Sequence, residues 1–244
     1  MPGDHQKGDD RKTEPSWCLS PVSHVPSGSP ASPSSPERVQ YADALNEALR
    51  VYREKDPRTM ALSSGAVYQP ERRYFLMGYC NDIYSITYPD GEVSPSSTKR
   101  FSMAPSVVER ILMLKYLSAY GGVAPSGKWV AFEELKSGPH HSKPFRDLAI
   151  KPLVERFGDE PEAFEACCVI LGGSRLSFGS ALAFCIPALP KVPLAVILWS
   201  KDEEFESRAS ILFDAASEHH LDTASLYMLG IEVSSRLRAL YDML

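Results

Sequence analysis

The sequence predicts an α+β fold: a mostly antiparallel sheet packed against helices, with a long C-terminal helix and a disordered N-terminal tail. Three observations lead to this prediction. Runs rich in β-branched and aromatic residues over 73–88 and 181–213 are broken by connections too short for parallel crossovers. Segments with apolar residues at helical spacing flank these runs. Residues 1–35 alternate charged residues with Pro and Ser and lack the apolar surface that ordering requires.

Length and charge exclude several classes of protein. The 244 residues suit one domain with an appendage, and 43% hydrophobic residues suffice for a core. A net charge of −5, with both signs scattered along the chain, argues against binding to nucleic acid or an anionic membrane. The longest apolar run, Leu194–Trp199, is far shorter than the roughly 20 residues of a membrane span. Met1–Asp10 has no apolar signal-peptide core, so a cytoplasmic location is expected.

The cysteines are too few and too scattered for a disulfide framework or a metal cradle. Their number is odd, and no pair has the C-x-x-C spacing of zinc or iron–sulfur ligands. Two of them are adjacent on a predicted helix, where neighbouring side chains diverge by about 100°. All are expected as reduced thiols, most of them buried: Cys18, Cys80, Cys167, Cys168 and Cys185.

The ordered part is predicted to be a single domain over residues 36–244. Its first helix begins near Ser34, which has capping-box spacing to Glu37. Apolar residues then recur at helical spacing as far as Tyr52, and Asp56-Pro57 marks the end of the helix.

A small antiparallel meander follows this helix. Arg73–Tyr79 and Ile83–Tyr88 are predicted strands, and Cys80-Asn81-Asp82 between them has the composition of a turn. Pro89-Asp90-Gly91 forms a second turn before a short strand at Glu92-Val93.

The middle of the chain is predicted to be mostly helical. Pro105 suits the first position of a helix that stops at Gly121-Gly122. A short strand is assigned to Lys128–Leu135. Two further helices are predicted over Arg146–Phe157 and Glu162–Leu171, the second ending at a glycine pair.

The C-terminal third contains three predicted strands and a long helix. The strands are Ala181–Ile186, Leu194–Trp199 and Ala209–Phe213. The helix begins near Thr223, with Asp222 as its N-cap, and carries a nearly heptad-spaced apolar seam. Nine residues separate the last two strands, fewer than a parallel crossover needs, so this pair is predicted to be antiparallel.

Polar and aromatic side chains around these strands are the candidate binding residues. An antiparallel pair places the acidic turn that follows Trp199 at one end and Asp214 with the histidines at the other. The two groups are then separated by a strand of about 17 Å and cannot share one metal ion, so no metal site is assigned. The candidates are Lys191, Trp199, Asp202, Glu203, Asp214, His219 and His220.

Two local interactions are predicted near Asp214. Its carboxylate is expected to accept backbone N–H groups of the following turn, and its second partner is expected to be Lys191. Pro187, Pro190 and Pro193 recur every three residues, which is the repeat of a polyproline II segment. The segment is expected to be a rigid connector between two strands or, alternatively, a partner-docking edge.

Several phrases together resemble one bacterial protein family, the domain of unknown function 3786. The resemblance covers about residues 40–243. It rests on the segments GKWVAFEEL (127–135), ALPKVP (188–193), DEEF (202–205) and LFD (212–214). It implies no established activity. It implies relatives in largely anaerobic bacteria, some of them fused to a cysteine-rich iron–sulfur module, and hence a role near redox or corrinoid cofactors.

Three functions stay open at this point. The first is a non-catalytic binding or accessory module of unknown ligand, connected with redox or corrinoid cofactor metabolism. The second is a metal-dependent hydrolase with a site near Asp214, His219 and His220. The third is a protein-docking module that uses the Pro187–Pro193 edge and the N-terminal tail. The cofactor stays unidentified, and the expected partner is a protein or a cofactor, with neither nucleic acid nor membrane involved.

Overall fold

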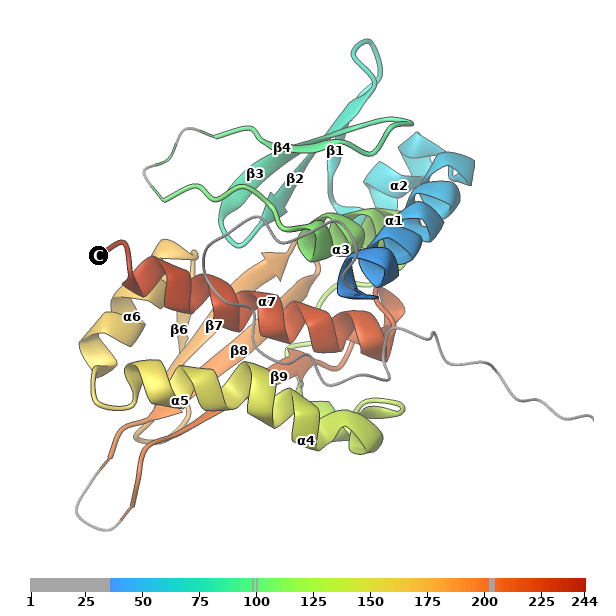
Figure 1. Ribbon diagram of the computed structural model, residues 1–244. Coiled ribbons are helices and arrows are strands. Elements are labelled where there is room, and N and C mark those ends of the chain that lie inside the picture. Colours follow the sequence, from blue (N-terminus) through green and yellow to red (C-terminus); the bar gives the residue numbers. More distant parts are fainter. Residues whose placement is uncertain (1–35, 98, 100, 202–204) are drawn as a thin grey trace, which may run out of the picture.

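A computed structural model describes residues 36–97, 99, 101–201 and 205–244 (Figure 1). The predicted tail over 1–35 and the candidates Asp202 and Glu203 lie outside the described residues. In the rest, two antiparallel sheets are combined with helices, as the fold class predicts. None of the helices in the described ranges has the length and apolarity to cross a bilayer.

The smaller sheet is a four-stranded meander with strand order β1-β2-β3-β4. Its β2–β3 hairpin was predicted within one residue, and β1 was not predicted. The helices beside this sheet are α1, α2 and α3, and α3 packs against both of the others (Figure 1). The bounds are α1 Pro36–Glu54, α2 Pro57–Ser64, β1 Val67–Gln69, β2 Tyr74–Tyr79, β3 Asp82–Thr87, β4 Val93–Pro95 and α3 Val107–Ser118.

The larger sheet has five strands in the order β5-β9-β8-β7-β6, all paired antiparallel. Helix α7 crosses this sheet and contacts α3, α5 and α6 (Figure 1). The bounds are β5 Trp129–Ala131, α4 Ser142–Phe145, α5 Lys151–Phe157, α6 Pro161–Ile170, β6 Ser174–Leu176, β7 Leu182–Leu189, β8 Val192–Trp199, β9 Arg208–Asp214 and α7 Thr223–Tyr241.

The antiparallel pairing predicted from the nine-residue connection is confirmed. Trp199 pairs with Arg208 at one end of β8–β9, and Leu194 pairs with Phe213 at the other. Asp222 caps α7 as predicted, because its carboxylate accepts the backbone N–H of Ser225 at 2.7 Å.

The polyproline II prediction for residues 187–193 is wrong. Strands β7 and β8 form a hairpin whose turn is Pro190-Lys191, and Pro187 and Pro193 lie within the strands. The ladder shifts register between Ile186 and Leu189, and such an irregularity accommodates the missing proline N–H. The apolar neighbours of the prolines are buried, and this burial decides the backbone against an isolated polyproline segment.

Three predicted element boundaries also need correction. Pro105 precedes α3 rather than opening it, because Ser106 is the N-cap and forms a capping box with Glu109. The strand assigned to 128–135 is only β5, since a 3₁₀ turn begins at Phe132. The chain also continues into a second helix at Pro57, where proline occupies the first turn and Asp56 is the cap.

The two sheets are joined through a hairpin turn. Cys80 and Asn81 both have positive φ, 47° and 65°, as a two-residue type I′ turn requires. The backbone N–H of Cys80 donates to the carbonyl groups of Pro187 and Ala188, both at 3.2 Å. The tip of the smaller sheet is thereby held against β7 of the larger one, and one apolar core extends through both sheets.

Candidate functional site

The predicted role of Asp214 is half right. Its Oδ1 accepts the backbone N–H of Ala216 at 2.8 Å, which is the expected Asx-type bond. Lys191 is not its partner: the Lys191 ammonium donates to the carbonyl oxygens of Ser63 at 2.8 Å and Gly122 at 3.2 Å. The turn of the β7–β8 hairpin lies next to the end of α2, so Lys191 donates to the Ser63 carbonyl there and to the Gly122 carbonyl.

Asp214 also holds a loop that precedes β5. It accepts the Ser126 N–H and hydroxyl, each at 2.9 Å, and the Gly127 N–H at 2.7 Å. Burial raises the pKa of this carboxyl, but the hydrogen bonds from Ser126, Ala216 and Gly127 outweigh it and hold the pKa below its usual value. The carboxylate is therefore fully engaged by the backbone around it.

His220 holds the same loop from the other side. Its buried ring makes a hydrogen bond of 2.8 Å between Nε2 and the Val123 carbonyl and lies 5.6 Å from the ring of Tyr116. Burial lowers the pKa of His220, so the neutral ring is favoured. His219, its neighbour, is exposed. We call residues 121–127 the clamped loop, because Lys191, Asp214 and His220 each hold part of its backbone.

Among the described candidates, Trp199 does not join this cluster. Trp199 is partly buried, packs against a small apolar cluster with Ala181 and Ile197, and has the Arg208 guanidinium 4.6 Å from its ring. Across residues 36–97, 99, 101–201 and 205–244, no three His, Cys, Asp or Glu side chains come together as metal ligands. The predicted site residues therefore mainly fix the backbone of one loop.

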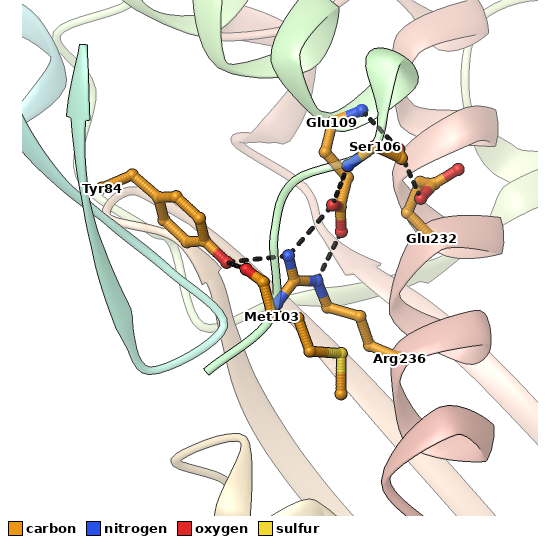
Figure 2. A network of polar contacts seen from close by, with 6 residues as sticks. All are labelled: Tyr84, Met103, Ser106, Glu109, Glu232 and Arg236. Carbon is orange, nitrogen blue, oxygen red and sulfur yellow. Dashed lines mark hydrogen bonds and ion pairs between the residues drawn. The ribbon is translucent and has the colours of Figure 1, made fainter. Parts of the chain in front are cut away.

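A different cluster, which the sequence did not predict, lies where α7 passes α3 and the smaller sheet. Arg236 on α7 forms a buried ion pair with Glu109 on α3 (Figure 2). Its Nε donates to one carboxylate oxygen of Glu109 and its Nη2 to the other, the second at 3.0 Å. The side chains are 5% and 4% exposed, so the pair is almost completely removed from water.

Further contacts fix the orientation of this arginine. Its Nη2 also donates to the Tyr84 hydroxyl at 2.9 Å, and that hydroxyl donates to the Met103 carbonyl at 2.8 Å (Figure 2). The rings of Tyr79 and Tyr84 lie 4.8 and 5.7 Å from its guanidinium carbon. Burial opposes the charge, but Glu109 outweighs it and keeps the pKa of Arg236 above its usual value.

Glu232 is a second carboxyl group at the edge of this cluster. Ser106 donates its hydroxyl to Glu232 at 3.1 Å (Figure 2). Burial and the nearby charge of Glu109 raise the pKa of Glu232 to about 7, although the Ser106 bond acts in the opposite direction. Its protonation state therefore changes near neutral pH.

A cavity of about 220 Å³ opens beside Arg236. Its walls are the β2–β3 turn, the C-terminal end of α6, α7 and the segment before α3. Asn81 ties two walls together by donating its side-chain amide to the Ile170 carbonyl at 3.0 Å. The lining residues are Cys80, Asn81, Asp82, Lys99, Phe101, Val169, Ile170, Leu171 and Arg236.

Charged groups of both signs border the cavity. Arg236 is the buried cation, and Lys99 is an exposed one whose ammonium donates to the Asn81 carbonyl. Asp82 is buried and accepts the Ser97 hydroxyl at 3.0 Å. Cys80 also lines the cavity, and burial raises the pKa of its thiol to about 12, so it stays protonated at neutral pH.

One sequence signal could have revealed this cluster. Arg236 lies on the same face of α7 as the apolar seam through Val233 and Leu240, where a charged side chain has to be paired. Its partner, Glu109, belongs to the Ser106 capping box, which explains its position but not its burial. The pairing joins residues 127 positions apart, and nothing local in the sequence indicates it.

Together these features define an α+β protein with two antiparallel sheets, in which the β2–β3 turn, the end of α6 and α7 border a small open cavity. The chain belongs to the family described as Domain of unknown function (DUF3786), whose model matches residues 56–236. The resemblance drawn from the sequence is thus confirmed, and the match contains both Glu109 and Arg236. No curated protein and no solved structure matches this chain.

Proposed function

We propose that the protein is a non-catalytic binding module whose ligand occupies the cavity beside Arg236. The observation that carries the proposal is the combination of an open cavity of about 220 Å³ with a buried, rigidly oriented arginine in its wall. Binding sites are typically concave and largely pre-formed, with a few polar groups that orient the ligand. Asn81 and the β2–β3 turn supply such a pre-formed wall.

The chemistry of the lining supports binding rather than catalysis. A nucleophile needs a lowered pKa or an adjacent base, whereas burial raises the pKa of the Cys80 thiol to about 12. Glu109 is occupied by Arg236 and by the Ser106 backbone N–H, which it accepts at 2.8 Å. The groups that face the cavity are therefore suited to hydrogen bonding and charge pairing.

The volume limits the ligand to a small molecule. The cavity measures about 220 Å³. It lies below the range of roughly 300–1,000 Å³ that drug-sized ligands occupy. A corrin macrocycle does not fit such a volume. We propose that this module binds a small metabolite in the redox or corrinoid context that the resemblance implies.

The two alternative functions have less support from the described residues. The hydrolase requires a metal held near Asp214, His219 and His220, but Asp214 and His220 bind backbone groups of the clamped loop. The docking module loses its polyproline edge, since residues 187–193 form a β-hairpin. Both stay hypotheses.

A rim substitution tests the proposal without disturbing the ion pair. Val169 lines the cavity yet is 55% exposed, so Val169→Trp should obstruct the entrance while leaving Arg236 untouched. Leu62→Trp is the matched control, because Leu62 is 84% exposed on α2 and does not line the cavity. The measurement is ligand-observed NMR on the full chain with a panel of anionic, neutral and cationic molecules of fewer than about ten non-hydrogen atoms.

The proposal predicts that some members of the panel bind the wild type and Leu62→Trp equally and that Val169→Trp loses this binding. It is wrong if no member binds the wild type, or if Val169→Trp binds the same members with unchanged affinity.

A further inference from the structure

The guanidinium of Arg236 has one nitrogen without a hydrogen-bond partner among the described residues. Arginine carries five N–H donors in a fixed plane. Three of them are used, by the two carboxylate oxygens of Glu109 and by the Tyr84 hydroxyl. The Nη1 group, with its two N–H donors, makes no hydrogen bond to any of the described residues. Because the side chain is only 5% exposed, these donors have little access to bulk water.

The surroundings of Arg236 leave the cavity as the place for an acceptor. Glu109 occupies one edge of the guanidinium, and the rings of Tyr79 and Tyr84 flank it. The Tyr84 hydroxyl is itself fixed by its bond to the Met103 carbonyl, so the plane of the guanidinium cannot rotate freely (Figure 2). Arg236 also lines the cavity of about 220 Å³. Donors that border a cavity are satisfied by an oxygen acceptor inside it, and a ligand oxygen can take that place.

The charges around the cavity indicate how much negative charge the ligand carries. Glu109 already balances one positive charge of Arg236 from behind. Lys99 adds a cation on the exposed side, and Asp82 contributes one carboxylate. Arg236 and Lys99 against Glu109 and Asp82 therefore leave the walls without net charge. An anion with one charge can contact both cations, whereas a dianion would be repelled more strongly by Asp82 and Glu109.

We propose that the cavity binds a small oxyanion with a single negative charge, such as a carboxylate, with one oxygen on Nη1 of Arg236 and Lys99 close to the charged group. This inference rests on the proposed binding function and specifies its ligand class. Nε and Nη2 are already used by Glu109 and Tyr84, so Nη1 offers one carboxylate oxygen a charge-assisted hydrogen bond. The apolar wall of Val169, Ile170 and Leu171 then faces the non-polar part of the ligand.

The test compares three probes that differ in charge and shape. Acetate, its neutral isostere acetamide and inorganic phosphate are titrated into the ¹⁵N-labelled full chain at pH 7.5, with ionic strength held constant by sodium chloride. The inference predicts that acetate binds at least tenfold more tightly than acetamide and more tightly than phosphate, which is mostly dianionic at this pH. The shifted amides should include those of Asn81 and Ile170.

Lys99→Gln tests the contribution of the second cation. We expect acetate affinity to fall by about three- to tenfold, since an exposed lysine contributes through a partly screened charge. Lys143→Gln, a matched change at an exposed lysine away from the cavity, should leave the affinity unchanged. An equal effect of both substitutions would show only a general response to net charge, and the proposed binding site beside Lys99 would then be wrong.

The outcomes separate the ligand class from the binding function. If acetamide binds this cavity as tightly as acetate, the oxyanion inference is wrong and the binding module stands. If phosphate binds more tightly than acetate, the inference of a single negative charge is wrong. If nothing binds and Val169→Trp changes nothing, both the inference and the proposed function fail.

Discussion

Arg236 and Glu109 form a bidentate ion pair that joins α7 to α3 across 127 positions of the chain, with both side chains at least 95% removed from solvent. Burying two charges is costly, and the cost is offset only when the remaining donors and acceptors are satisfied. Here the Ser106 N–H and the Tyr84 hydroxyl satisfy further groups of the pair. Among the described residues the Nη1 group toward the cavity is the exception, and the proposed ligand class depends on it.

Removal of the Glu109 carboxylate should strongly destabilise the fold. In Glu109→Ala, Arg236 loses its counter-charge and stays buried, so we expect the free energy of unfolding to fall by about 3–5 kcal/mol. Glu92→Ala is the matched control, because Glu92 pairs with Arg110 while its own side chain is 66% exposed. This change should cost about 0–1 kcal/mol. Urea unfolding of both variants measures the difference, and similar values for the two would contradict a dominant role of the buried pair.

Glu232 should make stability depend on pH. Its pKa is about 7 in the folded protein and near 4.5 when unfolded, so the folded state binds more protons between these values. Its contribution is therefore complete below pH 4.5 and is lost as pH rises through about 7. Burial and the charge of Glu109 cause the shift.

Glu232→Gln should remove this dependence. The wild type should lose on the order of 1–3 kcal/mol relative to the variant between pH 4.5 and 7.5. The comparison of the two proteins cancels the opposite slope from His220, whose lowered pKa favours folding as pH rises. Parallel curves of unfolding free energy against pH would show that Glu232 has an ordinary pKa.

Asp214 should control the clamped loop. In Asp214→Asn one carboxylate oxygen is replaced by an NH₂ group, which cannot accept an N–H. The remaining oxygen can keep the Ser126 and Ala216 N–H groups, and the Gly127 N–H then loses its acceptor. We expect a loss of about 2–4 kcal/mol and faster hydrogen exchange at residues 121–127. Asp147→Asn, at an exposed aspartate, is the control. Unchanged exchange in the loop would mean that Asp214 does not hold it.

The sequence predicted the parts of the fold that depend on local chemistry. The turn at Cys80-Asn81-Asp82, the Asp222 cap and the short link before β9 each follow from residues close together in the chain. The Asx-type bond of Asp214 is of the same kind. Each was found because a few neighbouring residues restrict the backbone to few conformations.

The binding cavity could not be predicted in this way. It is built from a hairpin turn, the end of α6 and a residue on α7, and their proximity depends on how the sheets and helices pack. The Pro187–Pro193 repeat was misinterpreted for a related reason: burial of Leu189 and Val192 in the hairpin outweighs the local preference of proline. The arginine within the apolar seam of α7 was the one local indication of a buried polar site.

The most direct test of the central claim is a crystal structure of the full chain grown with acetate, compared with one grown with acetamide at the same ionic strength. We predict an acetate oxygen within about 2.7–3.0 Å of Arg236 Nη1, with the methyl group toward Val169 and Leu171. Acetamide should leave that position to solvent. A structure in which acetate is absent from the cavity, or in which Nη1 bonds to a protein group instead, would contradict the account.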